Sequence, residues 1–237
     1  MQQPDAKLSV LVLGASRGIG AATAAAFVER GHHVTATHRG SGTPTGTTPV
    51  LADMRDEDSI AAAVEAAVST GGQLNVMVVN AGIGRQEPLG QMTAQSAREV
   101  FEVNTISAMM AVKHAGEVMR RQGSGSMVLV SSESARRGIP GSSHYTASKA
   151  ALEGFMRSVM WEYGSQGIRI NTVAPGATDT DMLAPLPPER RAKFTESIPL
   201  GRFARPEEIA EVICWTAIST FLHGAVIPVT GGQGFGI

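Results

Sequence analysis

Short apolar runs alternate along the chain with longer, alanine-rich stretches of helical spacing. The apolar runs cover residues 8–13, 34–37, 74–79, 127–130 and 168–173, and the helical stretches cover residues 23–30, 59–69, 94–121, 143–164 and 206–218. Strands that are apolar throughout and separated by helices are typical of a parallel sheet covered on both faces. The pattern therefore predicts an α/β, doubly wound parallel sheet with right-handed crossovers.

The connection after the second apolar run departs from this alternation. Residues 40–49 consist of Gly, Ser, Thr and Pro, which form helices poorly. We expect a coil where a doubly wound fold normally has a helix between its second and third strands. An exposed sheet face there is tolerable if the strand lies near a sheet edge or a partner subunit covers it.

Length and composition set the class of protein. The 237 residues are 43% hydrophobic and show no break in composition, so we expect a single domain over residues 1–237. A cofactor-binding half would cover about residues 1–130, and a catalytic and substrate-binding half about 131–237. The formal net charge of −1 and the scattered arginines argue against a nucleic-acid partner.

The single cysteine and the absence of long apolar runs indicate the compartment. Cys214 cannot form an intrachain disulfide and lies in an apolar run, so we expect an inert buried thiol. No segment has the features of a secretory signal or a membrane span. The sequence predicts a cytoplasmic protein with no membrane partner and suggests no metal site.

A glycine-rich turn follows the first apolar run and leads into a helical stretch. The turn is Gly14-Ala15-Ser16-Arg17-Gly18-Ile19-Gly20. Glycines let the backbone approach a pyrophosphate, and the helix N-terminus offers free N–H groups to it. The spacing differs from the common G-x-G-x-x-G fingerprint, and a tight structural turn is the alternative. The position of the turn favours dinucleotide binding in a Rossmann fold.

The end of the second run indicates which dinucleotide is preferred. An acidic residue usually holds the adenosine 2′-hydroxyl, whereas a 2′-phosphate needs a cation. Here the run ends in Thr37-His38-Arg39 and has no carboxylate. Arg39 and Arg17 could both donate to a 2′-phosphate, so NADP(H) is favoured over NAD(H). Further on, Asp53, with Met54 beside it, could contact the adenine, or Asp53 could cap the helix that begins near residue 56.

Tyr145 and Lys149 form the most informative pair in the chain. Residues four apart share one face of a helix. An ammonium beside a phenol favours the phenolate, which makes the tyrosine a better proton donor and acceptor near neutral pH. A solvated polar pair on a helix surface is the alternative reading of this spacing.

Taken together, these motifs resemble the classical short-chain dehydrogenase/reductase family over nearly the whole chain. The resemblance is carried by Gly14-x-x-x-Gly18-Ile19-Gly20, Asn80-Ala81-Gly82, Asn104, Ser132, Tyr145-x-x-x-Lys149 and Pro175-Gly176, in the family's order. It implies that Tyr145 is the general acid, that Lys149 lowers the pKa of Tyr145 and binds the nicotinamide ribose, and that Ser132 binds the substrate oxygen. It also implies that Asn104 holds a water that links Lys149 to solvent.

The resemblance further implies cofactor contacts on three loops. Asn80, Ala81 and Gly82 would line the dinucleotide site, and Pro175, Gly176, Thr178 and Thr180 would wrap the nicotinamide. Glu133 and Arg136-Arg137 stand where the family usually has small and apolar residues. That departure has no account in the sequence.

Within the family, the chain is most similar to reductases of 3-oxoacyl thioesters carried on acyl carrier protein. The resemblance implies a homotetramer or dimer. Apolar side chains among prolines in residues 181–201 predict a mobile lid over an apolar acyl site. Arg120 and Arg121 are candidates for docking an acidic carrier protein. A ketone or secondary-alcohol oxidoreductase of specialised metabolism is the alternative. A catalytically silent dinucleotide-binding regulator is a third reading, which the four catalytic positions argue against.

Overall fold

One parallel sheet forms the centre of the protein. The computed structural model describes residues 7–234. The strand order is β3-β2-β1-β4-β5-β6-β7, and every neighbouring pair is parallel. The strands are β1 (Ser9–Leu13), β2 (His33–His38), β3 (Thr48–Leu51), β4 (Val76–Val79), β5 (Gly125–Val130), β6 (Ile168–Pro175) and β7 (Val226–Val229).

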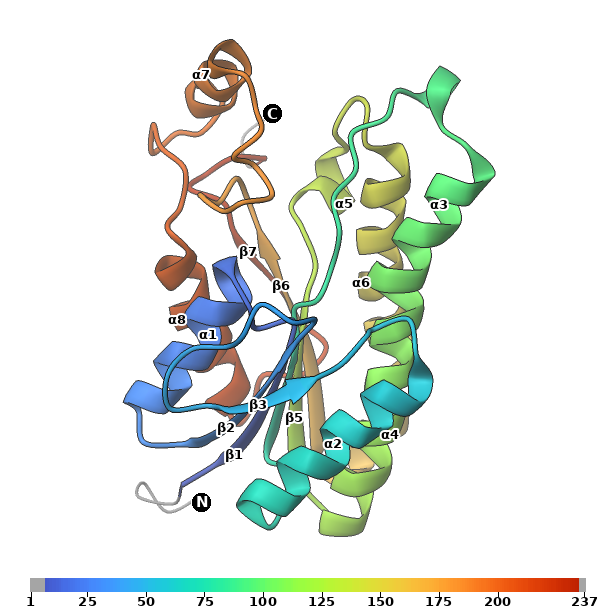
Figure 1. Cartoon of the computed structure of the whole chain (residues 1–237), viewed down its shortest axis with the longest axis vertical. Helices are drawn as coiled ribbons and strands as arrows, with labels where there is room; N and C mark the ends of the chain where they lie inside the picture. The colour runs from blue at the N-terminus through green and yellow to red at the C-terminus, as the bar shows by residue number, and fades with distance from the viewer. Residues whose placement is uncertain (1–6, 235–237) are drawn as a thin grey trace.

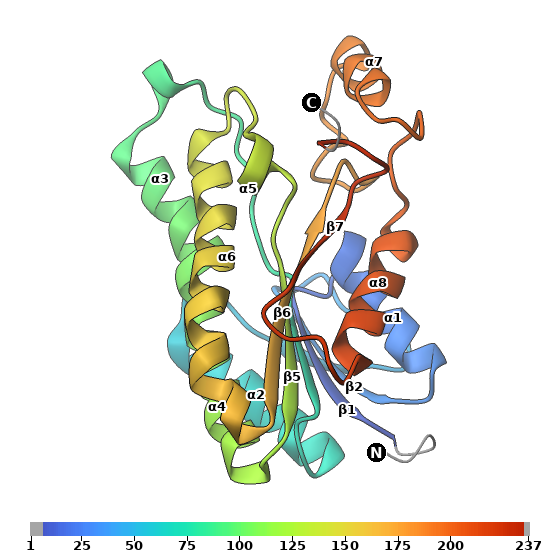
Figure 2. The ribbon, with the colours of Figure 1, turned by 180° about the vertical axis from the view of Figure 1, so that it is seen from behind.

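Helices cover both faces of this sheet. The α-helices are α1 (Gly18–Glu29), α2 (Glu57–Gly71), α3 (Ala94–Phe101), α4 (Ser107–Gln122), α5 (Ser134–Arg137), α6 (Ser143–Tyr163), α7 (Pro188–Glu196) and α8 (Pro206–Ile218). Short 3₁₀ turns occupy Leu89–Gln91 and Gly164–Gln166, and a π-helical turn occupies Glu102–Ile106. Figures 1 and 2 show α1 and α8 on one face and α2, α4 and α6 on the other. The doubly wound prediction is confirmed.

Two apolar cores form because the strands are buried on both faces. Leu11 and Leu13 point into the core under α2, α4 and α6, whereas Val10 and Val12 point into the core under α1 and α8. Alternate residues of a strand face opposite sides, so a strand that is apolar throughout supplies both cores at once. None of the helices in the described residues is both long and apolar enough to span a bilayer.

The predicted coil between the second and third strands is present. Residues 39–47 contain bends and turns but no helix, and β3 lies at the edge of the sheet. Only Val50 of β3 is even partly buried, and the other three residues are exposed. The edge position explains why the missing helix is tolerated, since little apolar sheet surface needs covering there.

Several element boundaries differ from the sequence prediction. Helix α1 begins at Gly18, inside the glycine turn, and so earlier than the predicted residue 23. Glycine has a low helix propensity, so the sequence pattern does not reveal the first helical turn. The predicted helix over residues 94–121 is interrupted, since the π-helical turn Glu102–Ile106 separates α3 from α4. Strand β7 contains Pro228, which a sheet accepts at an edge.

Helices α4 and α6, which flank the later strands, approach closely at a glycine. A Cβ on Gly116 of α4 would overlap the hydroxyl and ring of Tyr163 at the end of α6. At Gly154 of α6, by contrast, an added Cβ would meet only the Arg157 guanidinium, at 3.9 Å. Gly116 therefore sets the spacing between α4, which follows Asn104, and α6, which carries Tyr145.

We expect Gly116→Ala to destabilise the fold by ~1–3 kcal/mol through overpacking, although alanine is the better helix former. Gly154→Ala is the matched control and should be neutral or stabilising by up to ~1 kcal/mol. Urea unfolding measures both. In a Tyr163→Ala background the cost of Gly116→Ala should largely vanish, and an unchanged cost would refute this account of the contact.

Candidate active site

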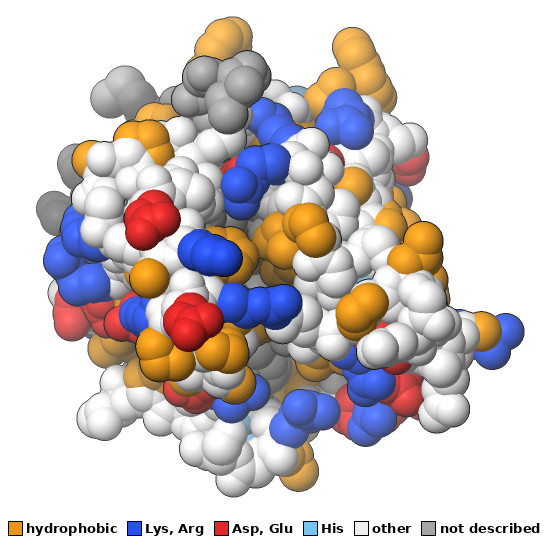
Figure 3. Space-filling model, turned by 90° about the horizontal axis from the view of Figure 1, so that it is seen from above, with side chains coloured by type: hydrophobic (Ala, Val, Ile, Leu, Met, Phe, Trp, Pro, Cys, Tyr) orange, Lys and Arg blue, Asp and Glu red, His pale blue; other side chains and the backbone are white. Residues whose placement is uncertain are grey.

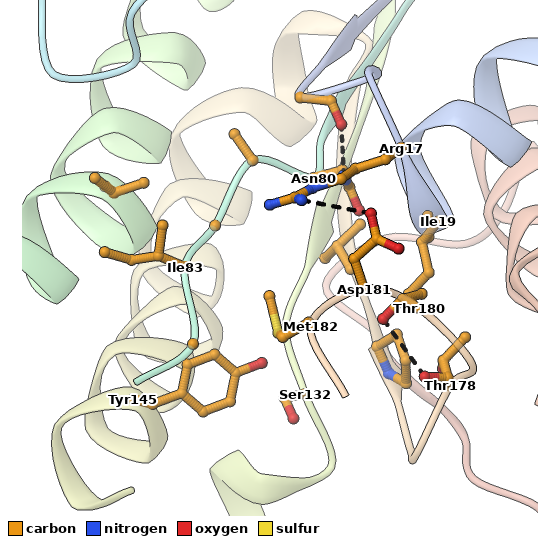
Figure 4. Close-up of a pocket in the computed structure, with 18 of the residues that line it drawn as sticks. Arg17, Ile19, Asn80, Ile83, Ser132, Tyr145, Thr178, Thr180, Asp181 and Met182 are labelled. Atoms are coloured by element: carbon orange, nitrogen blue, oxygen red, sulfur yellow. Dashed lines mark hydrogen bonds and ion pairs between the residues drawn. The ribbon is translucent and has the colours of Figure 1, made fainter. Parts of the chain in front are cut away.

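A cavity of about 1470 Å³ opens at the carboxyl edge of the sheet. All but two of the predicted site residues line it, from segments far apart in the chain. They are Gly14, Ser16, Arg17, Gly18, Ile19, His38, Arg39, Asp53, Met54, Asn80, Ala81, Gly82, Ser132, Tyr145, Lys149, Pro175, Gly176, Thr178 and Thr180. Gly20 and Asn104 lie behind this wall and support it. Figure 4 shows Tyr145 on one side of the cavity and Arg17 and Thr180 across from it.

The glycine turn brings backbone groups to the cavity wall. A Cβ on Gly14 would overlap Ala81, and one on Gly20 would overlap the Gly14 carbonyl, so both positions need glycine. The Gly14 N–H donates to Thr37 Oγ1 at 2.8 Å, and Asn80 Nδ2 donates to the Gly14 carbonyl at 2.8 Å. These bonds tie the turn to the ends of β2 and β4.

The N-terminus of α1 is free to bind an anion. Arg17 is the N-cap residue of α1. Its backbone is extended, and its side chain makes no capping hydrogen bond. Uncapped N–H groups at a helix start, next to a turn of small residues, bind phosphate groups well. The turn therefore fits the pyrophosphate of a dinucleotide.

Three arginines line the end of the cavity near β2 and β3. Arg17 forms an exposed ion pair with Asp181 at 3.4 Å (Figure 4), and Arg39 follows the end of β2. Arg55 was not predicted, and it binds Asp53, with Arg55 Nε 3.0 Å from Asp53 Oδ1. Hydrogen bonds from Arg55 hold the pKa of Asp53 low, at about 2.

The proposed capping role of Asp53 is wrong. Asp56 is the N-cap of α2, and its side chain accepts from the Asp58 N–H. The Asp53 backbone N–H instead donates to Ser59 Oγ at 3.1 Å.

Cations outnumber anions on the cavity wall. Within residues 7–234, the lining carboxylates are Asp53, Glu133 and Asp181, and each pairs with an arginine that also lines it. Arg39, Arg85 and Lys149 add further cationic groups. In Figure 3, which looks onto this end of the molecule, several Lys and Arg side chains surround the hollowed middle of the face. The cavity therefore suits an anionic ligand although the whole chain carries a net charge of −1.

Helix α6 places Tyr145 and Lys149 on the opposite wall. Lys149 is buried, and its Nζ donates to the Val130 carbonyl at 2.8 Å. Burial lowers the Lys149 pKa from 10.5 to about 8. The Nζ atom lies 6.0 Å from the centre of the Tyr145 ring.

Tyr145 is protonated near neutral pH in this structure. Burial raises the pKa of its phenol, while a hydrogen bond with Ser132 lowers it. Lys149 makes no comparable contribution, so its lowering of the Tyr145 pKa stays a prediction. Ser132 Oγ also accepts from the N–H and the hydroxyl of Ser134, at 3.2 and 2.9 Å, which fixes its orientation.

Asn104 joins the π-helical turn to two other segments. Its Oδ1 accepts from the Ile83 N–H at 2.7 Å, and its Nδ2 donates to the Ile83 carbonyl and to Ser148 Oγ, each at 3.0 Å. Ser148 Oγ in turn donates to the Tyr145 carbonyl at 2.7 Å. π turns insert one residue into a helix and are frequent at functional sites. Ser148 was not among the predicted site residues, because a small polar residue between Tyr145 and Lys149 is a weak signal.

The unexplained charges after Ser132 form two ion pairs around α5. Arg137 Nε lies 2.8 Å from the buried carboxylate of Glu133, and Arg136 Nε lies 3.8 Å from that of Glu153 on α6. Ser131 Oγ donates to the same Glu153 carboxylate at 3.2 Å. Glu133 thus anchors the loop that carries Ser132.

The segment predicted as a lid lies over the cavity and contains helix α7. Met182, Leu183, Leu186 and Phe194 line the cavity, whereas Ile198 is buried beside it. Arg190 of α7 donates to Gln86 Oε1 at 2.9 Å, which connects this segment to the loop after β4. The part of the cavity under this segment is therefore mainly apolar.

Comparisons with known proteins agree with this geometry. A family described as enoyl-(acyl carrier protein) reductase matches residues 14–233. The chain is 37% identical over 235 residues to 3-oxoacyl-[acyl-carrier-protein] reductase MabA of Mycobacterium tuberculosis, covering 98% of this chain and 95% of that protein. It is 38% identical over 245 residues to cis-4-hydroxycyclohexanecarboxylate dehydrogenase of Sinomonas cyclohexanicum, covering 98% of each.

A solved structure shares the whole fold. The ligand-free aldohexose dehydrogenase of Thermoplasma acidophilum superposes with a TM-score of 0.90 at 27% identity, over 98% of this chain and 95% of that one. The chain belongs to the short-chain dehydrogenase/reductase family. It is an oxidoreductase that acts on CH–OH groups and uses a nicotinamide dinucleotide.

The buried Lys149 should make stability rise with pH. Its folded pKa of about 8 lies below the ordinary 10.5, so between these values the unfolded chain binds more protons at this site than the folded chain. Raising the pH through this window therefore favours the folded state. The raised pKa of Tyr145 acts in the opposite direction, but only above about pH 10.

We expect the wild type to gain unfolding free energy relative to Lys149→Met between about pH 8 and about pH 10. Urea unfolding of the two proteins without added cofactor measures this difference. Identical pH dependence in both would show that Lys149 is not desolvated as the structure indicates.

Proposed function

We propose that this enzyme uses NADPH to reduce a 3-oxoacyl thioester, carried on acyl carrier protein, to the 3-hydroxyacyl thioester. The observation that carries the proposal is the placement of Tyr145 and Ser132 together on the wall of a cavity with an apolar end. Relatives named as 3-oxoacyl-[acyl-carrier-protein] reductases support the substrate class, at 37% identity in Mycobacterium tuberculosis and 35% in Thermotoga maritima.

Tyr145 and Ser132 act on the carbonyl oxygen of the substrate. A bound nicotinamide supplies the hydride in this chemistry. As the carbonyl carbon is reduced, negative charge grows on the oxygen, and the two hydroxyl groups stabilise it by donating hydrogen bonds. Tyr145 then transfers its proton to that oxygen. The raised pKa of Tyr145 favours this role, since the phenol enters the reaction protonated.

Lys149 and Asn104 return a proton to Tyr145. A Lys149 pKa of about 8 lets its ammonium give up a proton near neutral pH. A Cβ on Gly82 would stand 3.2 Å from Asn104 Oδ1 and 3.3 Å from Lys149 Nζ, so the absent side chain leaves space between the two groups. That space is where we place the water that connects Lys149 to solvent.

The partners follow from exposed features of two helices. Arg120 and Arg121 are exposed in the last turn of α4 and could dock an acidic carrier protein. Trp161 of α6 is 80% exposed, which supports a homotetramer or dimer that covers this helix. The residues at 181–201 would open to admit the acyl chain.

A second candidate is a dehydrogenase or reductase of cyclic alcohols and ketones. The 38% identical relative from Sinomonas cyclohexanicum is named for a hydroxycyclohexanecarboxylate, which favours this candidate.

Substrate choice is tested by following NADPH oxidation with acetoacetyl thioester and with cyclic ketones, including 4-oxocyclohexanecarboxylate. We expect the thioester to give the highest kcat/KM. Tyr145→Phe should lower kcat by ~10²–10⁴, since it removes the proton donor, and it controls for contaminating activity. No turnover of the thioester would refute the proposal, and turnover of the cyclic ketones alone would favour the second candidate.

Cofactor choice is tested at Arg39. Arg39→Ala should raise KM for NADPH by about tenfold or more and leave KM for NADH within about twofold, because a charge-assisted bond to a 2′-phosphate is lost. Arg98, an exposed arginine of α3 outside the cavity, gives the matched control Arg98→Ala. Equal effects of Arg39→Ala on both cofactors would contradict the preference for NADPH.

A further inference from the structure

Arg55 and Asp53 form a closed charge pair at the β3 end of the cavity. Asp53 Oδ1 accepts from the backbone N–H and from Nε of Arg55, each at 3.0 Å, and Asp53 Oδ2 accepts from Nη2. Both residues line the cavity. A fork of this kind occupies both carboxylate oxygens and cancels the charge locally.

This pair lies next to Arg39. His38, at the end of β2, is in register with Leu51, at the end of β3, and the Ala52 N–H donates to the His38 carbonyl at 2.9 Å. Neighbouring strands are about 5 Å apart. Arg39 directly follows the end of β2, and Asp53 lies two residues beyond the end of β3. The charge of Arg39 contributes to the low pKa of Asp53. An adenosine group bound at the end of β2 would therefore have Asp53 beside it.

An unpaired carboxylate at Asp53 would oppose a 2′-phosphate. A single negative charge and a phosphate dianion ~8 Å apart in water repel by an energy that corresponds to roughly fivefold in affinity. Among residues 7–234, Arg17 pairs with Asp181, and Arg39 has no carboxylate partner. If Arg39 binds the phosphate, Arg55 is the residue positioned to cancel the nearest opposing charge.

We propose that Arg55 is a specificity-determining residue, which favours NADP(H) by neutralising Asp53 rather than by contacting the phosphate. This inference rests on the proposed choice of NADP(H). In this proposal Arg39 and Arg17 contact the 2′-phosphate directly. Arg55 favours the same cofactor indirectly, because it neutralises Asp53. This neutralisation also explains why a carboxylate at this end of the cavity is compatible with a 2′-phosphate.

The test compares 2′,5′-ADP with 5′-AMP, which differ at the 2′-position, by calorimetric titration of the whole protein. The proteins are wild type, Arg55→Gln, Asp53→Asn, the double variant, and the exposed-arginine control Arg98→Gln. Arg55→Gln should weaken 2′,5′-ADP roughly fivefold and change 5′-AMP less than twofold. The double variant should return to within about twofold of wild type, because no carboxylate is left to neutralise.

Three outcomes would overturn the inference. A double variant as weak as Arg55→Gln would mean that Arg55 contacts the phosphate directly. Equal weakening of both ligands would mean that Arg55 supports the adenosine site in general, and no weakening would mean that Asp53 is too distant. Melting temperatures of the five proteins control for folding. The wild-type titration separates the two proposals, since equal affinity for both ligands would refute the NADP(H) preference itself.

Discussion

The hydrogen bonds between the Asn104 side chain and the backbone of Ile83 are the constraint on which the site depends. They hold the loop after β4 against the π-helical turn, and the bond from Asn104 to Ser148 extends the connection to α6. The Asn104 amide accepts from the N–H and donates to the carbonyl of Ile83. It therefore satisfies both backbone groups of a loop residue that has no neighbouring strand to pair with. The wall that separates the glycine turn from Tyr145 is fixed in this way.

The same loop is also held by contacts of Arg85, Gln86 and Glu87 with other elements. Arg85 pairs with Glu99 of α3, and Gln86 accepts from Arg190 of α7. The Glu87 N–H donates to the Gly141 carbonyl at 2.6 Å, and its carboxylate accepts from Ser96 Oγ. These partners lie on α3, on α7 and just before α6, so they connect the loop that Asn104 holds to three other elements. If residues 181–201 open to admit a substrate, as proposed, the contact between Arg190 and Gln86 links that opening to this loop.

The sequence predicts those parts of the site that depend on spacing along one element. Tyr145 and Lys149 share a helix face, and the glycine turn follows a strand, so their geometry is local. The strand pattern likewise predicts the sheet, because residues buried on both faces leave a continuous apolar run. The absence of a helix between β2 and β3 is also predictable, since the Gly, Pro and Thr residues at 40–49 form helices poorly.

The parts that escaped prediction depend on pairing between segments, or on one extra residue in a helix. Glu102–Ile106 contains Val, Asn, Thr and Ile, which form helices less well than Ala or Leu. A low helix propensity does not distinguish a π turn from an α-helix, so the composition does not reveal the turn that directs Asn104 toward Ile83. The partner of Glu133 is four residues along the chain, but the Arg136–Glu153 pair joins two elements. Arg55 sits two residues from Asp53 in a turn, where periodicity carries no information.

The charge balance of the cavity emerges only when these pairs are known. Taken from the sequence, Asp53, Glu133 and Asp181 are acidic residues that would oppose an anionic cofactor. In the folded chain each of these carboxylates pairs with an arginine of the cavity wall. The remaining cationic side chains of the wall therefore give the cavity a positive electrostatic potential. An ion pair that is exposed contributes little to stability, yet it removes a repulsion from the ligand's position. The local charge of the cavity therefore depends on which of its carboxylates are paired with arginines, and a net charge counted over the whole chain gives no guide to it.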